Sequence, residues 1–262
     1  MHRLLAHHRP VVGVLHLPPL PGAPFEGPGL QAIVAGALRD AEVLATGGAR
    51  GVVVENLGDA PFAKEVEPHV VAAMTVVARE VVERFGSDLT VGINVLRNDA
   101  AGALAVAAAS GAGFVRINVH VGAMVTDQGV IEGRARETLL YRNRVAPGVA
   151  IVADHLVKHA QPLAPVDSVQ LARDTLHRGG ARVLVLSGSG TGQPTSVEEL
   201  EALRAALPEA TLWIGSGLNP DNAGDYSAAD AAIVGTALHG HADLSAPLDV
   251  ERVRAVVQAF GG

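Results

Sequence analysis

Residues 51–56 read Gly-Val-Val-Val-Glu-Asn, an apolar, β-branched run that ends in a carboxylate and an amide. A strand that is apolar at successive positions must be covered on both faces, which is typical of parallel sheets flanked by helices. Gly47-Gly48 ends a helical pattern just before this run, and a long helical pattern over 68–84 follows it. The stretch therefore predicts one strand of an α/β fold, with polar groups at its carboxyl end.

The same strand–helix unit recurs along the chain, and we count eight such units. The predicted strands are 11–17, 51–56, 89–95, 114–119, 149–154, 182–186, 212–214 and 230–234. The predicted helices are 31–46, 68–84, 100–110, 134–144, 166–178, 197–207, a short helix from Pro220, and 249–260, with residues 122–129 expected as a loop. Strict alternation predicts a parallel sheet, and eight units in 262 residues favour a single (β/α)8 TIM barrel over residues 1–262. An open doubly wound sheet is the main alternative, but no G-x-G-x-x-G joins the first strand to its helix.

Composition excludes several classes of protein. The chain has no Cys, 48% hydrophobic residues, 3% aromatic residues and a formal net charge of −7. Disulfides, thiolate metal centres and Cys nucleophiles are therefore excluded. The acidic balance argues against a nucleic-acid partner, and the scarcity of aromatic residues argues against stacking on bases. No apolar run reaches the ~20 residues of a membrane span and the start does not resemble a signal peptide, so we expect a cytoplasmic protein without membrane insertion.

Every predicted strand ends in polar residues or Gly, which is where a barrel carries its functional side chains. The candidates for substrate contact are His16, Asn56, Asn94, Arg97, Asn98, Arg116, Asn118, Asp127, Ser187 and Gly188. Polar residues are common in loops for structural reasons alone. However, Glu55, Asn94 and Arg116 stand at the ends of or inside apolar runs, where an unpaired polar group is costly. As a group, these residues predict a small-molecule site, whereas His239 and His241 are expected to be solvated.

Two Gly-containing turns suggest a phosphate site. Gly215-Ser216-Gly217 follows the seventh predicted strand with Pro220 at the start of a helix, and Gly235-Thr236 follows the eighth strand. Glycine lets backbone N–H groups approach an anion, and barrels commonly bind a substrate phosphate at these two loops. The alternative, purely structural explanation is that these glycines only allow tight turns. The sixth loop, 187–192, could add donors or move as a lid, but it lacks the Lys of a P-loop.

For chemistry, Glu55 and Asp154 are candidate general bases, and Lys158 is a candidate acid or electrostatic group. Lys158 could form a Schiff base if it is desolvated, although a role as a phosphate or carboxylate clamp is equally compatible with its position. No spacing of ligands supports zinc, and we expect no required cofactor. Carboxylates with Asn would suit Mg²⁺, which we keep as the minority alternative.

Several long strings resemble the BtpA family, which includes SgcQ-like proteins. They are His16-Leu17-Pro18-Pro19-Leu20-Pro21-Gly22, Glu55-Asn56 with Gly58-Asp59-Ala60-Pro61-Phe62, Val91-Gly92-Ile93-Asn94-Val95-Leu96-Arg97-Asn98-Asp99, Arg116-Ile117-Asn118-Val119, Gly122-Ala123-Met124-Val125-Thr126-Asp127-Gln128-Gly129, Lys158-His159-Ala160 and Gly215-Ser216-Gly217. The resemblance covers almost the whole chain. One departure lies at Asp154-His155, where the family pattern leads us to expect Asp-Val-His-x-Lys. The His is displaced by one position, so we discount His155 as a ligand.

The resemblance implies a barrel similar to the ribulose-phosphate-binding barrels, which agrees with the separate argument for phosphate. It also implies a link to photosystem I biogenesis in cyanobacteria, while other members resemble parts of sugar-utilisation operons or are labelled nucleoside triphosphatases. Our leading hypothesis is an enzyme, of the isomerase, lyase or hydrolase type, acting on a small phosphorylated metabolite such as a sugar phosphate or nucleotide-derived phosphate. The alternatives are a non-catalytic assembly factor for a membrane complex and a Mg²⁺-dependent nucleotide phosphohydrolase. We also expect a homo-oligomer, as is common among such barrels.

Overall fold

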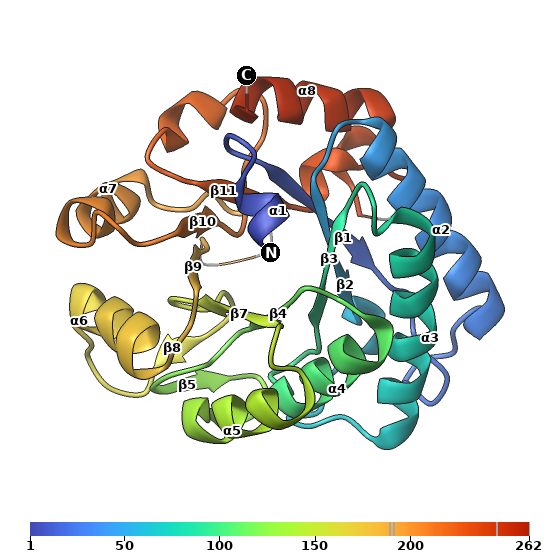
Figure 1. The fold of residues 1–262 in the computed structure, drawn as a ribbon, viewed down its shortest axis with the longest axis horizontal. Helices are drawn as coiled ribbons and strands as arrows, with labels where there is room; N and C mark the ends of the chain where they lie inside the picture. Colours follow the sequence, from blue (N-terminus) through green and yellow to red (C-terminus); the bar gives the residue numbers. More distant parts are fainter. Residues whose placement is uncertain (189, 191, 245, 262) are drawn as a thin grey trace.

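The computed structural model describes residues 1–188, 190, 192–244 and 246–261, and its centre is a closed barrel of parallel strands (Figure 1). Going round the barrel, the order is β1-β11-β10-β9-β7-β4-β3-β2. The strands are β1 Val11–His16, β2 Gly51–Glu55, β3 Thr90–Asn94, β4 Phe114–Ile117, β7 Ala150–Asp154, β9 Val183–Leu186, β10 Leu212–Ile214 and β11 Ala231–Val234. The predicted (β/α)8 barrel is therefore confirmed, and each predicted strand lies within two residues of its observed bounds.

Alternate residues of each strand face the inside of the barrel, as the period of two in a strand requires. The inward residues form an apolar cluster of their own, separate from the layer beneath the helices: Val12, Val14, Val53, Phe114, Val152, Val183, Val185, Trp213, Ala231 and Ile233. Trp213 and Phe114 meet edge to face across the interior, with ring centroids 5.9 Å apart. The short helix α1, His2–Leu5, lies over the centre of the ring in Figure 1, and its Leu4 is fully buried in the same cluster. The amino end of the barrel is thus filled by apolar side chains.

The helices form the outer ring. They are α2 Leu30–Thr46, α3 Pro68–Phe85, α4 Ala100–Ser110, α5 Ala135–Val145, α6 Ser168–Arg173, α7 Val197–Ala206 and α8 Val250–Gly261. In α2, Ile33, Ala37, Ala41 and Leu44 are buried at the spacing of one helical face. Helix α4 begins at Asp99, whose carboxylate accepts the Gly102 N–H, and ends at Gly111 in the left-handed conformation that favours glycine.

Two predictions of local structure were wrong, one of a loop and one of a helix. Residues 122–129 were expected as a loop, but β5 Ala123–Thr126 and β6 Gly129–Glu132 form a hairpin, and β5 also pairs with β8 Gln161–Pro162. No α-helix begins at Pro220; a 3₁₀-helix over Ala223–Tyr226 takes its place. The Asn219 carboxamide accepts the Asp221 and Asn222 N–H groups, and this local turn competes with a helical start.

None of the helices in the described part of the chain combines the length and the hydrophobicity that a membrane span requires.

Candidate functional site

A cavity of about 150 Å³ opens at the carboxyl end of the barrel. On one side it is lined by the ends of β1, β2 and β4, through His16, Glu55 and Arg116, and by Lys158 after β7. On the other side it is lined by the loops after β10 and β11: Gly215, Ser216, Gly217, Leu218, Asn219, Gly235, Thr236 and Ala237. The cavity thus joins the predicted catalytic side chains Glu55 and Lys158 to both predicted phosphate turns.

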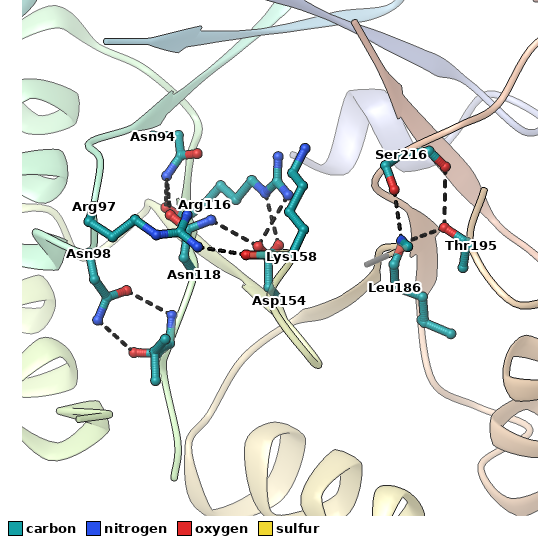
Figure 2. A network of polar contacts seen from close by, with 12 residues as sticks. Asn94, Arg97, Asn98, Arg116, Asn118, Asp154, Lys158, Leu186, Thr195 and Ser216 are labelled. Atoms are coloured by element: carbon teal, nitrogen blue, oxygen red, sulfur yellow. Dashed lines mark hydrogen bonds and ion pairs between the residues drawn. The ribbon is translucent and has the colours of Figure 1, made fainter. Parts of the chain in front are cut away.

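Arg116 is held in place by a buried two-point contact with Asp154. Its Nε and Nη2 donate to the two carboxylate oxygens at 2.8 and 3.1 Å (Figure 2), and both side chains are almost fully buried. Burial alone would lower the pKa of Arg116, but the Asp154 carboxylate and its hydrogen bonds outweigh that cost, so the pKa is raised. Arg116 therefore presents a permanent positive charge in a fixed position.

Two amides complete this polar layer. Asn118 Nδ2 donates to Asp154 Oδ2 at 2.8 Å, and Asn94 Nδ2 donates to Asn118 Oδ1 at 3.0 Å (Figure 2). Asp154, Asn94 and Asn118 do not line the cavity. Since the Asp154 oxygens are occupied by Arg116 and Asn118, its geometry suits the positioning of Arg116 better than the predicted role of general base.

Glu55 is the carboxylate that faces the cavity. It is 7% exposed, and its Oε1 lies 3.8 Å from Nε2 of His16. Burial lowers the pKa of His16 to about 4, although Glu55 opposes the shift. His16 is consequently neutral near pH 7, and within the described residues its Nδ1 is buried without a hydrogen-bond partner.

Lys158 enters the cavity from the loop after β7. Its main-chain carbonyl accepts a hydrogen bond from Arg97 Nη2 at 2.6 Å, which is the observed role of Arg97 (Figure 2). Burial lowers the pKa of the Lys158 ammonium, and the neighbouring positive charge of Arg116 lowers it further, while Glu55 and Asp154 act in the opposite direction. Arg97 itself is 6% exposed and does not line the cavity.

The turn after β10 requires glycine at position 217. Gly217 has φ +74°, and a Cβ there would lie 2.4 Å from the Pro194 Cα. In the described part of the chain, the N–H groups of Gly217 and Leu218 have no hydrogen-bond partner, and both residues line the cavity. At Gly235, an added Cβ would lie 2.8 Å from the His16 imidazole, so the absence of a side chain there makes room for His16.

The hydroxyl of Ser216 makes two hydrogen bonds to the protein backbone. It accepts the Gly188 N–H at 2.8 Å and donates to the Gln193 carbonyl at 2.9 Å, so it ties the loop after β9 to the loop after β10. Figure 2 shows the neighbouring tie from Thr195 to the carbonyls of Leu186 and Ser216. Ser216 and Gly188 therefore shape the cavity wall, and Ser216 offers an anion its backbone rather than its side chain. Ser189 and Thr191 of the same loop lie outside the described residues.

Four other candidates are not among the residues that line the cavity. Asn56 donates to Asp59 and accepts the Leu96 N–H, and Asn98 makes both of its hydrogen bonds to the Val119 backbone. Asp127 lies exposed in the turn between β5 and β6, next to Gln128. Ser187 Oγ is buried, with no partner among the described residues. The structure does not bring these side chains to the cavity, so the predicted contacts of all four with substrate are not supported by their placement.

The prediction that His239 is solvated was wrong. His239 is 7% exposed, its Nδ1 lies 2.6 Å from the Ala246 carbonyl oxygen, and its ring centroid lies 6.0 Å from that of His16. Its position behind His16 is fixed by the chain after β11, which no local sequence pattern encodes. His155 faces away from the cavity and contacts Ser168, which in turn donates to Glu199.

No group of three or more His, Asp or Glu side chains among the described residues is placed to hold a metal ion.

The sequence profile of the BtpA family matches residues 7–261. The chain belongs to the BtpA family. A curated relative, the photosystem I biogenesis protein BtpA of Synechocystis, is 45% identical over 97% of this chain and 88% of its own length. The resemblance seen in the sequence motifs is therefore confirmed, and it places this barrel among proteins of that family.

Solved structures share the fold of this chain at low sequence identity. Phosphoribosyl anthranilate isomerase from Thermus thermophilus matches with a TM-score of 0.59 and 13% identity, over 96% of this chain and 98% of the other. KGPDC from Streptococcus mutans matches with a TM-score of 0.59 and 11% identity, over 97% and 98%. At such low identity the match shows only the fold of this BtpA-family chain, which is a closed (β/α)8 barrel.

Proposed function

We propose that this BtpA-family barrel is an enzyme that acts on a small phosphorylated metabolite bound at the carboxyl end of the barrel. The observation that carries the proposal is the single cavity that joins Glu55, Arg116 and Lys158 to the glycine turns after β10 and β11. Those loops are the usual place for a substrate phosphate in this fold, and the name of one neighbouring structure, phosphoribosyl anthranilate isomerase, fits the same chemistry.

Each group in the cavity then has a role that its surroundings support. The N–H groups of Gly217 and Leu218, with Gly235 and Thr236 opposite, bind the phosphate. Arg116 adds a fixed positive charge. Glu55, which has no strong partner in the cavity, accepts a proton from the substrate, and Lys158 supplies positive charge or a proton at the reacting end.

Phosphate binding tests the proposal directly. We expect inorganic phosphate to raise the melting temperature of the protein, and soaked sulfate to give density against the loops 215–218 and 235–236. Gly217→Ala should abolish the stabilisation by phosphate, because the added methyl group meets Pro194. Gly224→Ala is the matched control in the same loop, since no atom lies within 4 Å of a Cβ there. Anion density elsewhere, or equal phosphate stabilisation of Gly217→Ala and the native chain, contradicts the proposal.

The name of the Synechocystis relative favours a second candidate, an assembly factor for a membrane complex such as photosystem I. The outer face of the small β6-β5-β8 sheet exposes Val125, Val130 and Leu163, and exposed apolar patches often mark contact with a partner. A complementation assay separates the two: Glu55→Gln removes an enzymatic function, whereas Val125→Ser with Val130→Ser removes an assembly function.

A nucleotide phosphohydrolase is the third candidate, and it would need Mg²⁺. Thermal-shift measurements with phosphosugars and nucleotides, each with and without Mg²⁺, distinguish it from the first. Stabilisation by a nucleotide only in the presence of Mg²⁺ supports hydrolysis of nucleotides, and stabilisation by a phosphosugar in the absence of metal supports the proposed function.

A further inference from the structure

Lysine is scarce in this chain, and its distribution is informative. Of the 20 basic residues, only Lys64 and Lys158 are lysines. Lys64 lies at the surface, where its ammonium donates to the Val130 carbonyl at 2.8 Å. Lys158 lines the cavity. Where this chain needs a fixed positive charge at the same site it has Arg116, whose planar guanidinium binds anions at two points. A lysine amine can act as a nucleophile, because it can lose its proton and then attack carbon, whereas the guanidinium of arginine stays protonated.

The surroundings of Lys158 suit a nucleophile better than a clamp. In the described part of the chain its Nζ makes no hydrogen bond and no ion pair, and Figure 2 shows the side chain running past the guanidinium of Arg116. The hydrogen bond from Arg97 to its carbonyl holds the backbone. Burial and the charge of Arg116 both lower the pKa of the amine, so more of it is neutral at a given pH.

We propose that Lys158 Nζ attacks the carbonyl carbon of a small phosphorylated aldehyde or ketone and forms a Schiff base, with the phosphate held by the glycine turns opposite. This step rests on the phosphate site of the proposed function and names the substrate class. The ammonium first transfers a proton to a base, for which Glu55 is the carboxylate in the cavity. The nitrogen–carbon bond then forms as the carbonyl π bond breaks, and a proton moves from the nitrogen to the oxygen to give a carbinolamine. The protonated Glu55 returns its proton to this hydroxyl group, which leaves as water while the nitrogen–carbon double bond forms. The product is the protonated imine.

Reductive trapping tests the proposal, and the two lysines make the outcome simple to map. The native protein and the Lys64→Arg variant are incubated with glycolaldehyde phosphate and cyanoborohydride near pH 7. Reduction of an imine fixes the ligand to the amine, adding the mass of the ligand less one oxygen atom. We expect one adduct on the peptide that contains Lys158, formed faster than any adduct on Lys64, since a lowered pKa leaves more of the Lys158 amine neutral and the cavity holds the ligand beside it.

Two comparisons show whether the phosphate site directs the reaction. Glycolaldehyde without phosphate should label Lys158 more slowly than glycolaldehyde phosphate, and inorganic phosphate should suppress the labelling by the latter. Lys158→Arg should lose the adduct while the protein is still stabilised by inorganic phosphate. The mapping in the native and Lys64→Arg proteins does not depend on how the Lys158 variant folds.

The outcomes distinguish a failure of the Schiff-base proposal from a failure of the proposed function. Equal labelling of Lys64, Lys158 and the terminal amine, or none at Lys158, overturns the Schiff base while phosphate stabilisation leaves the proposed function standing. If inorganic phosphate neither stabilises the protein nor affects labelling, the proposed function itself fails. Preferential, phosphate-sensitive labelling of Lys158 supports both.

Discussion

Arg116 and Asp154 depend on each other because both charges are removed from water. Replacing Arg116 with Met keeps much of the side-chain volume but leaves the Asp154 carboxylate buried without its partner. We expect the free energy of unfolding to fall by about 3–5 kcal/mol, the usual cost of breaking a buried ion pair from one side. Urea denaturation of both proteins measures the difference.

An exposed pair supplies the control for that measurement. Arg79 and Glu83 form an ion pair on the surface of α3, with each side chain about half exposed. Arg79→Ala should change the stability by about 0.5 kcal/mol or less. Equal effects at Arg116 and Arg79 would show that the buried pair is not needed for the fold.

His16 predicts a pH dependence of a definite sign. Burial lowers its pKa from 6.5 to about 4 in the folded chain. Between these values the unfolded chain binds more protons, so stability rises with pH through this window and is fully present above about pH 6.5. From pH 7 to pH 5, the native protein should lose roughly 2 kcal/mol more than His16→Gln, as measured by urea denaturation. Parallel losses in the two proteins would show that His16 titrates normally.

Adjacent residues show how far the site was predictable. The sequence placed Glu55 and Asn56 together at the end of one strand, and both were candidates. The period of two sends one side chain into the barrel and the other outward, and the structure puts Glu55 in the cavity and Asn56 against Asp59. The alternation of side chains along a strand could have distinguished Glu55 from Asn56 on the sequence alone. It could not have revealed that Asp154 binds Arg116, because that contact depends on the register between β4 and β7.

Asp99, at the start of α4, accepts two backbone hydrogen bonds from different segments of the chain. Asp99 accepts the Gly102 N–H at 2.7 Å as a cap, and its second oxygen accepts the Val66 N–H at 3.0 Å from the loop before α3. Asp167 caps α6 in the same way, by accepting the Gln170 N–H, but it has no second contact of this kind among the described residues. We expect Asp99→Ala to cost about 2 kcal/mol and Asp167→Ala about 1 kcal/mol in chemical denaturation. Costs in the reverse order would mean that the Val66 contact does not contribute.

Element prediction succeeded where a pattern is repeated and failed where the chain departs from it. The strand 51–55 and the helix 100–110 have a clear period and clear ends, and the structure has both nearly as predicted. The hairpin from β5 to β6 was missed because its strands are largely exposed and carry no continuous apolar run of the kind that marks the buried barrel strands. The helix from Pro220 was wrong because Pro at a helix start is only permissive, and the side-chain hydrogen bonds of Asn219 decide the local fold.

At the scale of the molecule, stability depends on filling the barrel from its amino end. Leu4 of α1 is fully buried against the inward residues of the strands. Leu4→Ala should lower the free energy of unfolding by about 2–5 kcal/mol, since the rigid strands cannot close over the cavity left behind. Leu5, next in the same helix and partly exposed, is the matched control, and its replacement by Ala should cost clearly less. A negligible effect at Leu4 in denaturant titrations would show that α1 is not part of the folded core.

The fold and the family were predictable because both are spread over the whole chain. Alternating strands and helices repeat eight times, so an error in one unit does not change the outcome, and the motifs of the family extend from residue 16 to residue 217. The cavity was less predictable, since it depends on which side chains reach it from separate loops. Lys158 was predicted as a member of the site. That its amine lies near Arg116, with no hydrogen-bond or ion-pair partner among the described residues, emerges only from the assembled barrel.

The single tryptophan of the chain, Trp213, can serve as an intrinsic fluorescence probe. Trp213 is fully buried, lies edge-on to Phe114, and stands two residues before Gly215 on the same inward side of β10. Its emission should be blue-shifted and resistant to iodide quenching in the native state, since the indole has no contact with solvent. A ligand in the cavity contacts the turn that begins at Gly215, two residues from the indole. Binding can therefore be followed by intrinsic fluorescence in unlabelled protein, before any substrate or product is known.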